Sequence, residues 1–438
     1  MSAAGPSRLR LLRDLPTLRH GLVEYLCRLV SEYGETVHFP LLRPTYLVTN
    51  PKDVHHLLVV NPRNYHKAGG LAVSKELFGA GVVTSEEPLH SQQRRVMQPM
   101  FHRSSIVRLA SQMASLAAAH VSNWRTDQVV DLSIEMMDLT LVIASAALFT
   151  VDTETTARDL GSAFTTAQRL ITRRQRKVPL PLWLPTPTNR RYKDAVARID
   201  RLISEIIECR RMLSNPPPDL LTMLLEARLP NGAAMSNQQL RDEIASMLFA
   251  GHETVSNHLT WTWYLLSQNR DIEMRLIKEW DSVLSGSAPN LEQISALTFT
   301  EMVLAESLRL LPPVWTLHRR AVEEDQLPSG LSLRPGDELL ISQYVSHRNP
   351  LYFTNPEAFR PERWTSEFKE SLPAGVYFPF SFGPRSCIGD NFARLEAVML
   401  LTTIGQHFTL SPVDKTARKE TLLTLRPLGG MKVTVRHR

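Results

Sequence analysis

The sequence predicts a mainly α-helical fold with small β-sheets, organised as a single domain over residues 1–438 around a long central helix. Helical periodicity dominates from about Pro51 to Gln268, and short strand patterns stand on either side of it. The longest helical stretch, Ser236 to Asn269, begins with a capping-box pattern and would extend for roughly 45–50 Å. A helix of that length crosses a whole domain, so we expect a functional site at its middle.

The other elements follow from local signals. Residues 1–17 are expected to be flexible, and an amphipathic helix is expected from Leu18 onward. Two short strands around a turn at Arg43-Pro44 come next, and strands and coil return after Pro313. Loops rich in Gly, Ala or Pro are predicted at 67–84, 178–188 and 215–219. A transit peptide is the less favoured alternative at the N-terminus, suggested by four arginines: Arg8, Arg10, Arg13 and Arg19.

Composition and charge exclude several classes of protein. Hydrophobic residues make up 43% and charged residues 21% of the chain, ordinary values for a globular protein with a core. The net charge of +6 comes without a nucleic-acid-binding motif, so no nucleic-acid partner is expected. No stretch of about 18 or more apolar residues occurs, which predicts that the chain has no transmembrane anchor.

The three cysteines, Cys27, Cys209 and Cys387, are too few and too far apart for a disulfide framework or a CxxC metal site. That usage is typical of a reducing compartment, and we expect a cytoplasmic protein. Cys27 and Cys209 lie in helical patterns and are expected to be ordinary packed thiols. Cys387 differs from them in its neighbours.

Cys387 lies in the segment FSFGPRSCIG, residues 380–389, directly before a predicted helix. A thiolate there would lie at the helix N-terminus, where unpaired N–H groups and the helix dipole lower a cysteine pKa. Gly383 and Gly389 would allow the backbone to approach a large planar group, where a Cβ would clash. The fixed spacing FxxGxRxCxG is completed by Phe380 and Arg385.

On this match the sequence resembles the cytochromes P450, and the resemblance covers nearly the whole chain, from about Leu18 to the C-terminus. It implies the fold of that family, heme b (iron protoporphyrin IX) as cofactor, and Cys387 as the iron ligand. A thiolate ligand pushes electron density onto the iron and favours cleavage of the O–O bond. The resemblance therefore implies a haem-thiolate monooxygenase that uses O2.

A buried ion cluster is predicted to support the cysteine loop. Glu306 and Arg309 form an ExxR pair on one helix face, in an apolar context stopped by two prolines. A buried pair needs its remaining donors and acceptors satisfied. The resemblance implies that Arg363 completes the cluster. The further ExxR pairs, Glu208–Arg211 and Glu357–Arg360, are expected to lie on the surface.

The middle of the long helix carries AGHET at 250–254, which resembles the family's oxygen-activation motif. The small Ala250-Gly251 pair would let a flat ligand and O2 lie against the helix. Glu253 is expected to relay protons through water, and the Thr254 hydroxyl to bond the oxygen or the i−4 carbonyl. His252 is expected to be a bystander. The family often has a second Thr where this chain has Val255, which leaves the hydrogen-bond network open.

The two haem propionates need cationic or donor partners. Matching positions lie in the W/HxxxR helix of the family, beyond the double proline, and in the cysteine loop. Arg95 and Arg320 are adjacent alternatives. The residues assigned to this role are His90, Arg94, Arg319 and Arg385.

The resemblance also implies the pocket walls: the 67–84 loop, the 164–190 region, the motif in the long helix, residues 314–317 and the C-terminal turn. These walls are mostly apolar, so a small hydrophobic substrate is expected. The contexts QRRVMQPMFH and PPVWTLHRRAV are similar to those of bacterial terpene-oxidising members, which favours a terpenoid; a fatty acid is the main rival. The assigned pocket residues are Phe249, Ala250, Val314, Trp315, Thr316 and Leu425.

No electron-transfer domain is attached, so electrons are expected from a separate ferredoxin and ferredoxin reductase that meet a basic face near Cys387. The protein is expected to be a monomer. The pair Glu253-Thr254 argues against peroxide-driven chemistry and against a haem carrier without turnover. The basic run 173–177 and the apolar residues after it are expected to form a lid; a membrane-surface contact is the alternative.

Overall fold

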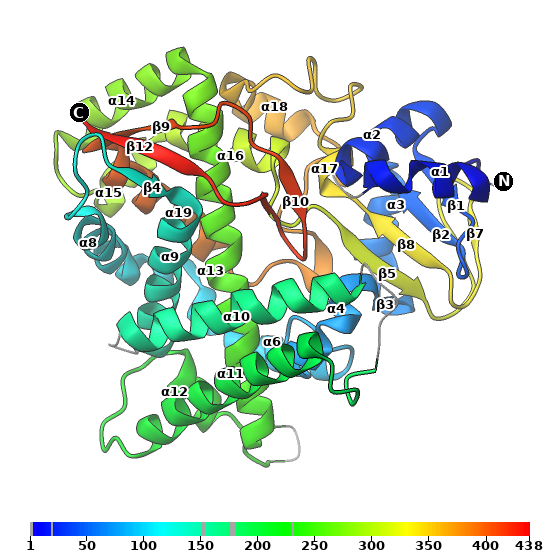
Figure 1. Ribbon diagram of the computed structural model, residues 1–438, viewed down its shortest axis with the longest axis horizontal. Helices are drawn as coiled ribbons and strands as arrows, with labels where there is room; N and C mark the ends of the chain where they lie inside the picture. The colour runs from blue at the N-terminus through cyan, green and yellow to red at the C-terminus, as the bar shows by residue number, and fades with distance from the viewer. Residues whose placement is uncertain (1–2, 19–20, 151–153, 176–180, 230–231) are drawn as a thin grey trace.

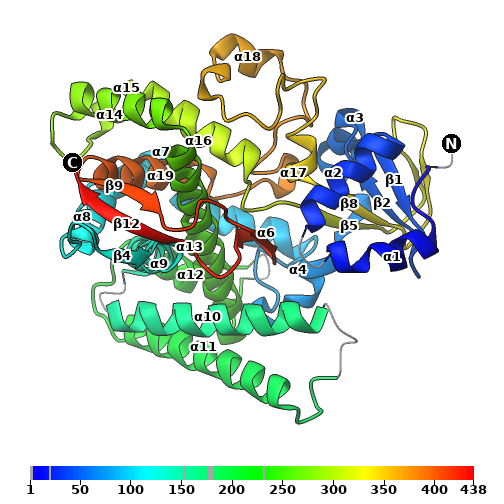
Figure 2. The same cartoon turned by 45° about the horizontal axis from the view of Figure 1, so that its top comes forward.

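The computed structural model describes all residues except 1–2, 19–20, 151–153, 176–180 and 230–231 (Figure 1). Helix α13 passes through the middle, with most other helices on one side and the largest sheet on the other (Figures 1 and 2). The α-helices are α1 Arg8–Leu18, α2 Leu22–Tyr33, α3 Pro51–His55, α4 Gly69–Val73, α5 Lys75–Phe78, α6 Leu89–Met97, α7 Arg103–Ile106, α8 Ala110–Val121, α9 Leu132–Phe149, α10 Glu154–Gln175, α11 Pro187–Arg211, α12 Leu220–Glu226, α13 Asn237–Gln268, α14 Arg270–Leu284, α15 Leu291–Ala296, α16 Thr298–Leu310, α17 Gln343–Ser346, α18 Ser366–Ser371 and α19 Asp390–Gly405.

The described strands form small sheets. The largest has the order β1 (Thr36–Phe39), β2 (Thr45–Val48), β8 (Glu338–Ile341), β5 (Leu317–Ala321) and β3 (Tyr65–Lys67). The predicted hairpin is confirmed, because β1 and β2 pair antiparallel around the turn at Arg43-Pro44. The remaining sheets are β4 (Val129–Asp131) with β12 (Lys432–His437) and β9 (Phe408–Pro412), β10 (Lys419–Thr421) with β11 (Leu425–Pro427), and β6 (Asp325–Gln326) with β7 (Ser332–Leu333).

Helix α13 confirms the long helix that the sequence predicts. The Ser236 side chain caps it by accepting from the backbone N–H of Gln239 at 3.2 Å. Most of its residues are buried, as expected for a helix that runs through a core. Helix α9 packs along it, and the Thr140 hydroxyl of α9 donates to the carbonyl oxygen of His252 at 3.0 Å. Among the described helices, α9 alone is long and apolar enough to cross a membrane, but 61% of it is buried inside the protein.

Three sequence expectations differ from the structure. The expected flexible segment 1–17 contains helix α1, because Arg10 ties it to α2 through the Tyr33 hydroxyl at 2.9 Å and the Glu32 carboxylate. The expected loop 67–84 contains α4 and α5. Cys27 is partly buried and packs against the core, as predicted, but Cys209 is exposed on α11.

Two acidic residues near the start of α13 hold the loop that follows α5. The Asp242 carboxylate accepts from the backbone N–H of Ala80 at 2.8 Å, and the Glu243 carboxylate accepts from that of Val82 at 2.9 Å. Glu243 is fully buried. Burial raises its pKa to about 8; nearby Asp242 raises it further and Lys67 opposes the shift.

Because an unfolded glutamate ionises near pH 4.5, the raised pKa of Glu243 links stability to pH. The contribution of the protonated Glu243 side chain to the free energy of unfolding is complete below about pH 4.5. It is lost as the pH rises through about 8. Glu243→Gln keeps an acceptor for Val82 and cannot ionise. It should raise the free energy of unfolding at about pH 9 and change it little at about pH 5, measured by urea denaturation. Glu205→Gln, at an exposed position of α11, is the control; an equal gain in both variants would contradict the assignment.

Candidate functional site

Cys387 faces an internal cavity of about 1540 Å³. It follows a short 3-10 turn, Gly383–Arg385, and α19 begins three residues after it, at Asp390. Its backbone N–H donates to the carbonyl oxygen of Phe380 at 2.8 Å, which closes the loop. Phe380, Arg385, Cys387 and Gly389 all line the cavity, so the loop presents four of its five motif residues to one space.

Gly383 is the fifth motif residue, and its role differs from the expected approach to a planar group. It does not line the cavity. Its φ is +68°, a conformation that side chains rarely adopt, and a Cβ there would lie 2.2 Å from the carbonyl oxygen of Leu58. The glycine therefore allows the loop to pack against the π-helical turn His56–Val60.

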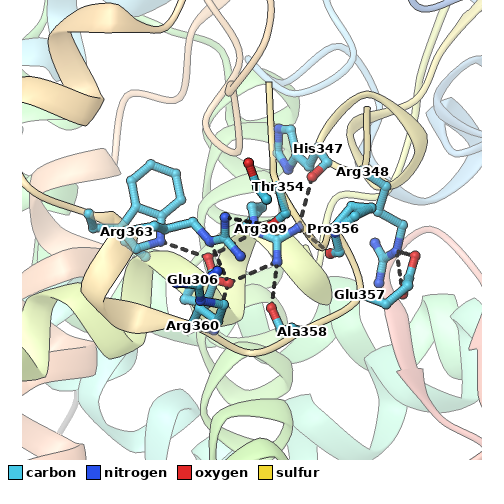
Figure 3. Close-up of polar contacts among 12 residues, drawn as sticks. Glu306, Arg309, His347, Arg348, Thr354, Pro356, Glu357, Ala358, Arg360 and Arg363 are labelled. Atoms are coloured by element: carbon cyan, nitrogen blue, oxygen red, sulfur yellow. Dashed lines mark hydrogen bonds and ion pairs between the residues drawn. The ribbon is translucent and has the colours of Figure 1, made fainter. Parts of the chain in front are cut away.

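The structure brings Glu306, Arg309 and Arg363 together (Figure 3). Arg309 binds the Glu306 carboxylate through Nε at 2.9 Å and Nη2 at 2.8 Å, and the Nε of Arg363 adds a bond of 3.0 Å. The backbone N–H of Arg360 and the indole N–H of Trp364 each donate at 2.9 Å. The side chains of Glu306 and Arg309 are wholly buried, and their hydrogen bonds offset the cost of removing these charges from water.

A chain of contacts joins this cluster to the cysteine loop. Arg309 Nη1 donates to the carbonyl oxygen of His347 at 3.0 Å (Figure 3). The His347 ring accepts from the backbone N–H of Phe378 through Nε2 at 3.0 Å. Burial lowers the pKa of His347 well below its usual value, so the ring is neutral and able to accept. Phe378 leads directly to Phe380, whose carbonyl holds the N–H of Cys387.

Burial raises the pKa of the Cys387 thiol to about 11, although the backbone N–H of Gly389 opposes that shift. The lowered pKa expected from the helix N-terminus is therefore wrong for the protein alone. Cys387 is exposed to the cavity, but the protein that surrounds it desolvates the thiol, and this outweighs the effect of the helix end on the pKa.

Helix α13 supplies the wall of the cavity that carries the AGHET segment. Phe249, Ala250, Gly251 and Thr254 line the cavity, as does Val255 in place of the second threonine. The Thr254 hydroxyl donates to the Ala250 carbonyl at 2.7 Å, which is one of the two predicted arrangements.

His252 points elsewhere, as its predicted bystander role requires. Its ring lies near the rings of Phe164 and Phe249, and its Nδ1 contacts the carbonyl oxygen of Leu248 at 2.5 Å. Burial lowers its pKa.

Glu253 is buried beside the cavity, held by two neutral donors from distant parts of the chain. Its Oε1 accepts from Gln168 Nε2 of α10 at 2.7 Å and from the Thr424 hydroxyl at 2.5 Å. Thr424 in turn accepts from Asn257 Nδ2 at 3.2 Å. Thr424 lines the cavity whereas Glu253 does not. The Thr424 hydroxyl is thus the link between the Glu253 carboxylate and the cavity.

The predicted propionate partners divide into two sets. Arg385 lines the cavity and lies near Arg319, and burial lowers the pKa of Arg319 to about 10. Arg94 instead donates to the Ser386 carbonyl at 2.6 Å and so fixes the residue before Cys387. His90 is buried, its Nδ1 lies 3.3 Å from Glu87, and burial together with nearby Lys67 lowers its pKa to about 4.

Lys67 also belongs to this cation cluster, although no motif in the sequence marks it. It pairs with Arg319 across β3 and β5, and burial together with nearby Arg385 lowers its pKa to about 7. Its Nζ donates to the carbonyls of Val82 and Ser85. The run YHKAGG before the Gly-rich segment is a weak strand signal, and the partner strand is far away in the sequence. Gln168, Asn257 and Thr424 gave no local signal at all.

The other cavity walls are partly as predicted. Val314, Trp315 and Thr316 line it, as do residues of the 67–84 segment. At the C-terminal turn, residues 421–424 line the cavity in place of Leu425, which is buried and accepts from the indole N–H of Trp261 at 3.0 Å. No residue from the described part of 164–190 is in the lining. The basic run 173–177 falls on residues whose side chains lie outside the described part of the structure.

The model of the family described as Cytochrome P450 matches residues 4–434. The chain belongs to the cytochrome P450 family. It is 34% identical over 432 residues to cyclooctatin synthase of Streptomyces melanosporofaciens, covering 94% of this chain and 93% of that protein. It is 32% identical over 374 residues to cyclooctat-9-en-7-ol 5-monooxygenase of the same organism, covering 85% and 81%. The heme domain of cytochrome P450DA matches with a TM-score of 0.89 at 26% identity, covering 100% and 98%. The predicted family and fold class are confirmed.

The residues around the cavity of this cytochrome P450 monooxygenase fit a haem. The side chains of Arg319 and Arg385 are buried close together with Lys67, which is partly buried, beside them, and the Glu86 carboxylate lies 2.6 Å from Arg385. The two arginines carry more positive charge than Glu86 neutralises, which suits a ligand with two carboxylates. Cys387 would hold the iron, and a bound metal deprotonates a coordinating thiol. When bound, thiolate-ligated haem iron supplies the activation of O2.

The protein's own residues would then position substrate and protons. The apolar side chains of Phe249 and Val314 would exclude water from the part of the cavity that they line once substrate is bound. The Thr254 hydroxyl is held against Ala250 and stays within the cavity wall. The Glu253 carboxylate accepts from the Thr424 hydroxyl at Oε1, and that hydroxyl would connect the carboxylate to the cavity.

Removing the Glu306 carboxylate should destabilise the protein strongly. Glu306→Ala leaves Arg309 and Arg363 buried without their partner, which costs about 3–5 kcal/mol in the free energy of unfolding. Urea denaturation of the haem-loaded protein measures the loss. The control is Glu362→Gln, which breaks an exposed pair with Arg275 and should cost less than about 1 kcal/mol. Similar losses in both variants would show that the buried cluster is not essential.

Removing the Thr424 hydroxyl should uncouple oxygen use from product formation. Thr424→Val deletes both the donor to Glu253 and the acceptor for Asn257, so proton delivery slows, by about tenfold or more. The measurement is product formed per O2 consumed, alongside the unfolding midpoint. Thr424→Ser keeps the hydroxyl and should restore coupling. If the valine variant stays fully coupled, the hydroxyl has no part in proton delivery.

Proposed function

We propose that the chain inserts one oxygen atom from O2 into a terpenoid of low polarity. The observation that carries this proposal is the lining of the cavity. Among the described residues that form it, no acidic side chain occurs and Arg385 alone is a permanent cation. His258 and His318 also line it, but burial lowers the pKa of each to about 4, so both are neutral near pH 7. A substrate is therefore bound mainly by burial of apolar area.

The same lining argues against a fatty acid, the main alternative. A carboxylate in the cavity would need a cationic partner. Arg385 is the permanent cation of the described lining and is assigned to a haem propionate, so no further permanent cation of that lining is left for a substrate carboxylate. One relative is named for monooxygenation of cyclooctat-9-en-7-ol, an unsaturated alcohol by its name. Hydroxyls of Thr254, Thr316 and Thr424 in the lining suit a substrate with one such polar group.

The cofactor is proposed to be heme b with Cys387 as its axial ligand. Lys67, Arg319 and Arg385 would bind the propionates, and Ala250-Gly251 would lie against the ring face. Glu253 and Thr254 are assigned to oxygen activation. A peroxide-driven enzyme would not need the buried Gln168–Glu253–Thr424 contacts, which supports chemistry with O2.

The electron donor is proposed to be a separate acidic ferredoxin with its reductase. Residues 88–126 contain no aspartate or glutamate. Arg95 and Arg103 are exposed there, and the neighbouring Arg94 binds Ser386 beside Cys387. A basic surface next to the cysteine loop is suited to an acidic partner. We expect the chain to act as a single-domain, cytoplasmic monomer.

A ligand screen tests the substrate class. A sesquiterpene hydrocarbon, a cyclic diterpene alcohol, lauric acid and palmitic acid are titrated separately into the haem-loaded protein. The terpenes should shift the Soret band to shorter wavelength as water leaves the iron, and the acids should shift it less. The band of the reduced, CO-treated protein, red-shifted for thiolate ligation, serves as the control for an intact site. Saturation by the fatty acids alone would overturn the terpenoid proposal.

A further inference from the structure

Gln343, the first residue of α17, is a buried amide in the wall of the cavity. It lines the cavity that contains Cys387, and it has no surface exposed to solvent. Among the described residues, none provides a hydrogen-bond partner for its Oε1 or for its Nε2. A buried amide costs free energy unless its polar atoms are paired. The Gln343 side chain therefore offers both a donor and an acceptor to a molecule bound in the cavity.

Gln343 is fixed in place by the residues on either side of it. The Ser342 hydroxyl donates to the carbonyl oxygen of Trp315 at 2.9 Å, and the backbone N–H of Tyr344 donates to the same oxygen at 3.3 Å. Trp315 lines the cavity, and its indole N–H donates to the carbonyl oxygen of Leu422 at 3.0 Å. The amide is thus held beside the part of the wall that is assigned to the substrate.

The hydroxyls of this wall differ from Gln343 because they already donate to the protein. Thr254, Thr316 and Thr424 each donate to an oxygen atom of another residue, so they can accept from a ligand but have no proton to give to it. Among the described lining residues, Ser381 also has a buried polar atom without a partner, but it belongs to the cysteine loop. Gln343 is therefore the stronger candidate for a contact with the substrate.

The combination of a donor and an acceptor selects the chemistry of the ligand. A hydroxyl group can donate to the Oε1 of Gln343 and accept from its Nε2. A ketone or an ether can only accept, and a hydrocarbon leaves both ends of the amide unpaired. Sites that bind a hydroxyl discriminate against the analogue that lacks it, because their buried polar groups are then left without partners. The amide favours an alcohol over a ketone, and either of them over a hydrocarbon.

We propose that the Gln343 amide binds a hydroxyl group of the substrate and thereby sets the orientation of the substrate in the cavity. The substrate is then an alcohol, and the reaction follows an earlier step that places a hydroxyl on the carbon skeleton. The terpenoid nature of that skeleton rests on the proposed function, whereas the preference for a hydroxyl does not.

Ligand binding to the haem-loaded protein tests the proposal. Two pairs of probes are titrated by the shift of the Soret band: a cyclic diterpene alcohol with the matching hydrocarbon, and 1-dodecanol with dodecane. The quantity compared is the Kd of the hydrocarbon divided by the Kd of the alcohol. Gln343→Met removes the amide at similar side-chain volume and should lower this ratio by about tenfold or more. An unchanged ratio, or failure of the unsubstituted protein to bind either alcohol, would overturn the proposal.

Ser346→Ala is the matched control. Ser346 is also a residue of α17 with a buried polar atom that lacks a partner among the described residues, but it does not line the cavity. This variant should keep the ratio of the unsubstituted protein, and an equal fall in both variants would contradict a direct contact. Thr316→Val and His318→Phe remove competing polar groups of the lining. If either of them lowers the ratio while Gln343→Met does not, the hydroxyl is bound by that residue instead.

Two further results separate the remaining outcomes. If the dodecanol pair responds as expected but the diterpene pair does not bind, the terpenoid proposal fails and the role of Gln343 stands. The rate at which haem is lost to apomyoglobin is measured for each variant. A faster loss from Gln343→Met with an unchanged ratio would assign the amide to the cofactor. The CO spectrum and the unfolding midpoint show whether each variant is folded, and Gln343→Leu replaces the methionine variant if that one does not fold.

Discussion

The carboxylate of Glu306 accepts hydrogen bonds from two nitrogens of Arg309, from Arg363, from the backbone of Arg360 and from Trp364. A buried carboxylate without such partners would cost several kcal/mol, so the coil at 360–364 has to lie against α16. Arg309 also donates to three backbone carbonyls, at His347, Pro356 and Ala358. The irregular segment 347–364 is therefore fixed in place by its hydrogen bonds to the buried Glu306–Arg309 pair. Through His347 and Phe378 that constraint reaches the backbone of the cysteine loop.

Helix α13 transmits a second set of constraints to the opposite wall. It is buried along most of its length, so each polar side chain on it needs a specific partner. The carboxylates of Asp242 and Glu243 accept hydrogen bonds from the backbone N–H groups of Ala80 and Val82. The Glu253 carboxylate accepts hydrogen bonds from the side chains of Gln168 and Thr424. The partners at Ala80, Val82 and Thr424 lie in segments that line the cavity. The acidic residues of α13 thus fix the walls of the site, and one of them, Glu253, is also the residue proposed to act in oxygen activation.

Features set by residues close together in the sequence could be predicted, and contacts between residues far apart in the sequence could not. Periodicity and a cap were enough for α13, and spacing within one helix was enough for Glu306 and Arg309. Lys67 became visible only through the pairing of β3 with β5, which joins residues about 250 positions apart. The contact between Thr424 and Glu253 could not be predicted for the same reason, because the two residues are far apart in the sequence. The raised pKa of Cys387 depends on burial, which motif spacing does not report. Gly383 was predicted as a motif residue, but the structure needs a glycine there because the backbone of Leu58 lies too close for a Cβ. No local sequence pattern indicates that contact.

The cavity combines two kinds of recognition that place different demands on the chain. In the proposed assignment the cofactor would be recognised by charge: Arg319 and Arg385 are buried together beside Glu86, with Lys67 next to them, and a ligand with two carboxylates would relieve that imbalance. Because such a ligand binds the folded state preferentially, it also stabilises the fold. The proposed substrate would be recognised by shape and apolar area, because His258 and His318 are neutral in the lining. A change of one apolar side chain, such as Phe249 or Val314, would alter the second kind of recognition and leave the first intact. The site can thus change its substrate without losing the haem that performs the chemistry.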